Sequence, residues 1–111
     1  MSNIAVNLSD ADFEEKIKGA NVSIVDFWAP WCGPCKMMGP VFAELAEELK
    51  DKAKLVKLNT DDFPNLAQPF GIQGIPSVLV VKDGKEVDRI VGFAPKETMK
   101  AKIEELILIK Y

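Results

Sequence analysis

The chain has 111 residues, which is the length of one compact domain spanning residues 1–111. Its composition, 48% hydrophobic and 28% charged, excludes a disordered chain, and a net charge of −3 without any basic run excludes the usual footprint of a nucleic-acid-binding protein. No segment approaches the roughly 18 consecutive apolar residues of a transmembrane helix, and residues 1–20 lack the pattern of a signal peptide, so we expect a cytoplasmic protein without membrane association.

Strand-like and helix-like patterns alternate along the first part of the chain. Residues 4–6 predict a short strand, and residues 9–19 predict a helix that begins at a capping serine and ends at a glycine. The run over residues 22–28 is β-rich and apolar on both faces, as in strands buried at the centre of a sheet.

The middle of the chain predicts a long helix, a strand and a shorter connection. The helix covers residues 34–49, and its apolar stripe consists of Phe42, Leu45, Ala46 and Leu49. A strand over residues 54–59 follows, and residues 62–70 predict a short helix or an irregular connection.

The last part of the chain predicts a hairpin and a terminal helix. Residues 77–82 and 85–91 read as strands joined by Asp83-Gly84, a strong hairpin signal. A helix opens at Pro95, and its inner side carries Met99, Ile103, Leu106 and Ile107. The strongly apolar end over residues 106–109 favours docking under the sheet, with a dimer contact as the alternative.

These elements predict an α/β fold with a central mixed five-stranded sheet flanked by four helices. Strands separated by helices run parallel, the hairpin adds antiparallel strands, and helices cover both faces. In such sheets, binding and catalytic residues usually lie where strands end and helices begin.

Cys32 and Cys35 lie at such a place, in the sequence Trp-Cys-Gly-Pro-Cys between a strand and the long helix. Helical geometry separates their Cα atoms by about 5 Å, within the range that a disulfide needs. Cys32 precedes the helix, where free N–H groups and the positive dipole end favour a thiolate. We therefore expect Cys32 to be the accessible nucleophile and Cys35 the more buried resolving thiol, with Trp31 shielding the site and Pro34 fixing the turn.

Two arguments favour a redox role for this pair over a structural one. Structural disulfides are rare in the reducing cytoplasm, and a loop of four residues gives only about 2 kcal/mol of stabilisation, so the bond can break without unfolding the chain. The alternative is a zinc half-site, but a closed site needs four ligands and the chain has two cysteines and no histidine. We expect no metal.

The sequence resembles the thioredoxin family across nearly its whole length. The resemblance rests on the residues around both cysteines and on these segments: Asp26-Phe27-Trp28-Ala29, Lys57-Leu58-Asn59, Gly74-Ile75-Pro76, Asp83-Gly84 and Gly92. It implies the thioredoxin fold and a cytosolic, monomeric protein-disulfide reductase. It also implies disulfide-containing protein substrates, no bound cofactor, and recharging by a flavoprotein thioredoxin reductase that takes electrons from NADPH.

Asp26 interrupts an apolar strand, where a carboxylate is costly unless it is neutral or reached by water. The functional interpretation is a buried carboxyl with a raised pKa that exchanges a proton with Cys35, and the resemblance matches Asp26 to the family's buried aspartate. Lys57 is then its electrostatic neighbour, although a solvated surface lysine fits the sequence nearly as well.

The resemblance also implies a cis bond at Ile75-Pro76, against the disulfide. Without that resemblance the same residues read as a turn, because only about 5% of bonds before proline are cis. An apolar platform around Cys32 would then receive an extended substrate segment, and its members are Trp31, Gly33, Pro34, Ile75, Pro76, Val91 and Gly92. Trp28 is expected to pack behind the motif.

Two other functions remain as alternatives at the level of sequence. An oxidase or isomerase could use the same fold, although the Gly33-Pro34 dipeptide without histidine argues against a strongly oxidising pair. A non-catalytic binding subunit could use the apolar platform alone.

Overall fold

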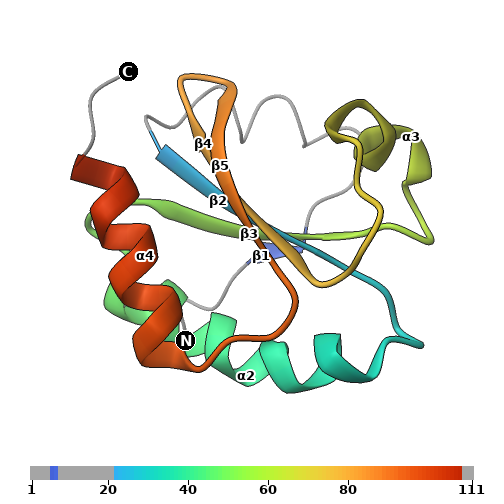
Figure 1. Cartoon of the computed structure of the whole chain (residues 1–111), viewed down its shortest axis with the longest axis horizontal. Coiled ribbons are helices and arrows are strands. Elements are labelled where there is room, and N and C mark those ends of the chain that lie inside the picture. Colours follow the sequence, from blue (N-terminus) through green and yellow to red (C-terminus); the bar gives the residue numbers. More distant parts are fainter. Residues whose placement is uncertain (1–5, 8–21, 109–111) are drawn as a thin grey trace.

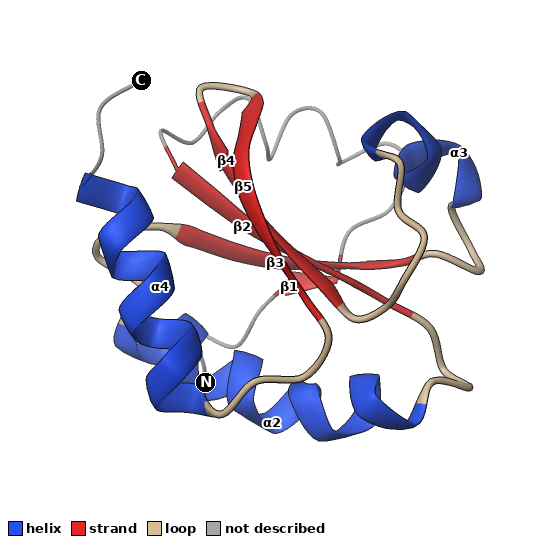
Figure 2. Ribbon diagram, in the orientation of Figure 1, coloured by secondary structure: helices blue, strands red, loops and turns tan. Residues whose placement is uncertain are grey.

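The computed structural model describes residues 6–7 and 22–108 (Figures 1 and 2). Its elements, in chain order, are β1 (Val6–Asn7), β2 (Val22–Trp28), α2 (Gly33–Glu48), β3 (Lys54–Asn59), α3 (Pro64–Ala67), the 3₁₀ turn η1 (Gln68–Phe70), β4 (Ser77–Lys82), β5 (Lys85–Val91) and α4 (Lys96–Leu108). The helix predicted over residues 9–19 lies outside the described residues. Of the strand predicted over residues 4–6, only Val6 lies within the described residues, and it belongs to β1. The other predicted elements are confirmed, and the connection over residues 62–70 contains α3 and η1.

The five strands form one mixed sheet in the order β1-β3-β2-β4-β5. β1, β3 and β2 run parallel, and β4 and β5 run antiparallel to their neighbours, as predicted. The connection from β3 to β4 starts and ends at the same end of the sheet, the end where β2 finishes. There Thr60 N–H bonds Trp28 O at 2.8 Å, and Ser77 pairs with Phe27. β4 therefore runs back along β2.

The central strands are buried on both faces because alternate side chains enter two separate cores. On one face α2 and α4 cover the sheet (Figure 2), and that core includes Ile24, Met38, Phe42, Leu45, Val80 and Ile103. On the other face lie α3 and η1, and that core includes Val25, Phe27, Leu58, Ala67, Leu79 and Val81. Helices on both faces were predicted, and this is confirmed.

Ion pairs join the two helices that share a face. Lys96 Nζ lies 3.1 Å from Glu44 and 2.7 Å from Glu48, and Lys100 Nζ lies 2.8 Å from Glu48. At the far end of α4, Leu108 is exposed, while Leu106 is buried against the sheet. Over residues 6–7 and 22–108, no helix has the length and apolar character required to cross a bilayer.

Candidate active site

The two cysteines lie in the turn that joins β2 to α2. The chain leaves β2 at Trp28, Cys32 N–H bonds Ala29 O at 3.2 Å, and the extended backbone of Cys32 (φ −90°, ψ 114°) caps the helix. Pro34 occupies the first helical turn, where its missing N–H costs no hydrogen bond. Cys32 and Cys35 form a disulfide with Cα atoms 5.2 Å apart, in agreement with the predicted spacing.

The helix N-terminus distinguishes the two sulfurs. Cys35 N–H donates to Cys32 Sγ at 3.1 Å, so the sulfur of Cys32 receives a backbone donor that has no partner within the helix. A negative charge on that sulfur would be stabilised by this bond and by the positive end of the α2 dipole. Cys35 lies inside the first turn of the same helix.

The predicted difference in exposure between the cysteines is wrong for the disulfide form. Each residue is only 5% exposed. Cys32 is covered because Ile75, 43 positions along the chain, places its carbonyl oxygen 3.7 Å from Cys32 Sγ. Both cysteines pack in a small third core with Ala29, Trp28 and Ile75, which confirms that Trp28 packs behind the motif.

The side chain of Trp31 is exposed beside the disulfide. Its indole is 69% exposed, and its Nε1–H donates to both carboxylate oxygens of Asp61, at 2.9 and 3.1 Å. Sequence reasoning missed Asp61, and the available signal was an Asx turn in which Asn59 Oδ1 accepts the N–H of Asp61 at 2.9 Å. A pocket of about 410 Å³ opens next to the indole, lined by Trp31, Thr60, Pro64, Ala67, Gln68, Ile72, Gln73 and Ile75.

Asp26 is a buried acid on β2, the strand that leads into the cysteine turn. It is 1% exposed, it lies on the face of β2 that α2 covers, and its Oδ1 has no hydrogen-bond partner among the described residues. Burial raises the pKa of Asp26 to about 7, and Lys57, its register partner on β3, opposes this rise. Lys57 Nζ also lies 4.9 Å from the centre of the Trp28 ring.

The expected platform residues come together around the disulfide. The Ile75-Pro76 bond is cis, as the family resemblance implied, and Pro76 O accepts Gly92 N–H at 2.8 Å. Val91 pairs with Ser77, directly after Pro76, and is 61% exposed. From the α2 side, Gly33 and Pro34 are exposed next to the cysteines. All seven predicted platform residues therefore lie on segments that meet at the end of the sheet where β2 finishes.

A protein-family model described as thioredoxin matches residues 4–105. The chain belongs to the thioredoxin family. Thioredoxin from Staphylococcus aureus is 48% identical over 94 residues (85% of this chain, 89% of that protein), and thioredoxin 1 from Synechococcus elongatus is 44% identical over 97 residues (86% and 91%). Among solved structures, a mutant thioredoxin from Halobacterium salinarum superposes with a TM-score of 0.87 at 28% identity, covering 98% of this chain and 96% of that chain.

Family membership and the paired cysteines together define the activity. The chain is a thiol–disulfide oxidoreductase of the protein-disulfide reductase type, and Cys32 and Cys35 are its redox pair. Thioredoxins carry no cofactor of their own, and disulfide-containing proteins are the substrate class that membership implies.

Proposed function

We propose that Cys32 is the attacking nucleophile and Cys35 the resolving thiol in the reduction of protein disulfides. The observation that carries this assignment is the bond from Cys35 N–H to Cys32 Sγ at the start of α2. The Cys32 thiolate attacks one substrate sulfur, and the other substrate sulfur leaves as a thiolate that takes up a proton. The Cys35 thiolate then attacks Cys32 Sγ, closes the Cys32–Cys35 disulfide and releases the second substrate thiolate. Two electrons and two protons pass to the substrate.

Asp26 is the proton acceptor for Cys35 in this scheme. A carboxyl with a pKa near 7 divides between its two forms at neutral pH, so it can take the proton when Cys35 becomes a nucleophile. Lys57 moderates that pKa from the neighbouring strand and stabilises the carboxylate once the proton has left.

The substrate lies as an extended segment across Trp31, Gly33 and Pro34 on one side and Ile75, Pro76, Val91 and Gly92 on the other. These residues are apolar or expose backbone, so they can receive disulfides in many sequence contexts. A flavoprotein thioredoxin reductase returns the pair to the dithiol form with electrons from NADPH. The chain acts in this way as a monomer in the cytoplasm.

Trapping the mixed disulfide tests the assignment of the two cysteines. In the reduced Cys35→Ser variant, attack by Cys32 on insulin should stop at the first step and leave a covalent adduct, close to one per chain, that mass spectrometry locates at Cys32. The matched Cys32→Ser variant should trap far less, because its remaining thiol lacks the position at the helix N-terminus. Equal trapping by the two folded variants would reverse or remove the assignment.

A further inference from the structure

Residues 71–76 run beside the redox pair without helix or strand structure. Ile72 and Gln73 line the pocket next to Trp31. Ile75 also lines that pocket, and its carbonyl oxygen lies beside Cys32 Sγ. The position of residues 71–76 therefore determines the shape of the surface, called the wall below, that a substrate bound at Cys32 would meet.

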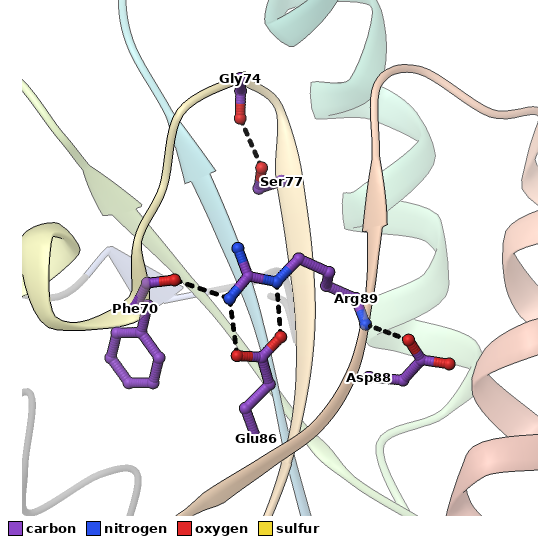
Figure 3. Close-up of polar contacts among 6 residues, drawn as sticks. All are labelled: Phe70, Gly74, Ser77, Glu86, Asp88 and Arg89. Carbon is purple, nitrogen blue, oxygen red and sulfur yellow. Dashed lines mark hydrogen bonds and ion pairs between the residues drawn. The ribbon is translucent and has the colours of Figure 1, made fainter.

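Contacts with β4 and β5 hold the C-terminal end of this segment. Ser77 Oγ donates to Gly74 O, and Pro76 O accepts Gly92 N–H at 2.8 Å (Figure 3 shows the Ser77 bond). Since Ser77 is the first residue of β4 and Gly92 directly follows β5, this end of the segment is held by the sheet.

Arg89 on β5 holds the other end. Its Nη2 donates to Phe70 O, the last carbonyl of η1, at 2.6 Å (Figure 3). The ring of Phe70 packs on Phe27 in the second core, with ring centres 5.7 Å apart. The guanidinium thus ties the start of residues 71–76 to the edge strand β5, where Arg89 is in register with Leu79 of β4.

Glu86 keeps the Arg89 guanidinium in this orientation. It accepts Nε at 2.5 Å and Nη2 at 2.7 Å, a two-point pairing in which the side chains are only 24% and 29% exposed. Residues three apart on a regular strand point to opposite faces, but the ladder shifts where Val81 pairs with Glu86 and Val80 pairs with Asp88. Val87 is the additional residue of this bulge, and it brings Glu86 and Arg89 to the same face.

We propose that Arg89, oriented by Glu86, is a positioning residue of the redox site that fixes residues 71–76 as a substrate-facing wall. It acts through Phe70 O and touches no reacting atom. The inference rests on the proposed function, because it concerns how a protein disulfide is held at Cys32. A small disulfide that does not reach the wall should not depend on Arg89.

The test compares Arg89→Met with the unchanged chain in single-turnover oxidation of the reduced protein, followed by tryptophan fluorescence. With insulin, the half-saturating concentration should rise about fivefold or more, while the limiting rate stays within about twofold. With bis(2-hydroxyethyl) disulfide, the rate constant should stay within about twofold of the unchanged chain. Arg89→Lys, which keeps one donor for Phe70 O but loses the two-point pairing, should give an intermediate value for insulin.

Lys96→Met is the matched control, because it removes another partly buried cation from its two carboxylates at a distance from the site. It should leave both substrates unaffected. An equal effect of Lys96→Met and Arg89→Met on insulin, or an Arg89→Met variant indistinguishable from the unchanged chain, would overturn the inference alone. If Arg89→Met does not fold, Arg89→Lys decides in the same way. An unchanged chain that reduces neither disulfide would refute the proposed function, and the positioning role with it.

Discussion

Burial of Asp26 under α2 makes its carboxylate form costly, because no donor among the described residues replaces the water that Oδ1 loses. The pKa of this carboxyl rises from 3.8 to about 7, with burial as the main cause and Lys57 acting against it. A raised pKa in the folded state means that the unfolded chain releases its proton more readily. The associated stability is complete below pH 3.8 and is lost as the pH rises through about 7.

This linkage predicts that Asp26→Asn stabilises the chain at high pH. The neutral amide has no charge to bury, so at pH 8 the variant should exceed the unchanged chain by about 2–4 kcal/mol in free energy of unfolding, and the difference should shrink toward zero near pH 4. Guanidinium unfolding at the two pH values measures it. Asp62→Asn, the same change at an exposed position, should have little effect at either pH, and a gain independent of pH at Asp26 would contradict the burial argument.

Sequence reasoning at the residue scale identified Asp26, Cys32 and Cys35 because each breaks a local pattern or occupies a helix start. It failed on the relative exposure of the cysteines, since the cover over Cys32 comes from Ile75, which is distant in sequence. Asp61 escaped for the same reason. Its partner, Trp31, lies 30 positions away, and an acidic residue after a strand has many possible roles.

At the scale of elements, α2 and α4 are joined by charges as well as by a shared core. Hydrogen bonds from Lys100 and Lys96 lower the pKa of Glu48 from 4.5 to about 2. A lowered pKa in the folded state stabilises the chain above pH 4.5, and this contribution is lost as the pH falls through about 2. Because Glu48 is solvent-accessible, the effect is modest and sensitive to salt.

Glu48→Gln should therefore lower the midpoint of thermal unfolding at neutral pH and low salt, by a few degrees at most. The shift should decrease in 1 M salt, where the screening length is about 3 Å, and it should disappear near pH 2. Differential scanning calorimetry provides the measurement. Glu105→Gln, an exposed change on α4, is the control, and an equal shift at both positions or in all salt conditions would argue against the helix-joining role.

The sequence predicted helices and strands correctly where the apolar period was clear, as in β2 and α2. It did not reveal the bulge in β5. Alternation places Glu86 and Arg89 on opposite faces of a strand, so their pairing could not be predicted. The bulge at Val87 has no glycine or proline to mark it in the sequence, and it becomes visible only in the register with β4. The role proposed for Arg89 depends entirely on that register.

At the scale of the whole molecule, β2 is the central strand of the sheet, and three segments that are distant in sequence meet at the end of the sheet where β2 finishes. The turn after β2, the segment before β4 and the end of β5 meet there, through Cys32 with Ile75 and Pro76 with Gly92. The sequence could predict the sheet and the redox turn, because both follow from local patterns. The pocket beside Trp31 is formed by side chains from separate segments, so it emerges only after folding.

The same organisation separates the redox bond from the bulk of the cores. The two large cores contain neither cysteine, and the disulfide belongs to the small third core at the sheet edge. The bond closes a loop of four residues, for which the loss of chain entropy in the unfolded state gives about 2 kcal/mol. Reduction should therefore lower the free energy of unfolding by about this amount, and the reduced chain should still unfold in one cooperative transition.

Urea unfolding with and without dithiothreitol measures this difference, and the two curves should have similar slopes because both forms expose the same cores. In the double variant Cys32→Ser and Cys35→Ser, the reductant should leave the curve unchanged, which separates reduction from any solvent effect. A reduced chain that is unfolded without denaturant would mean that the bond is structural. It could not then open and close during turnover, because each catalytic cycle passes through the dithiol form.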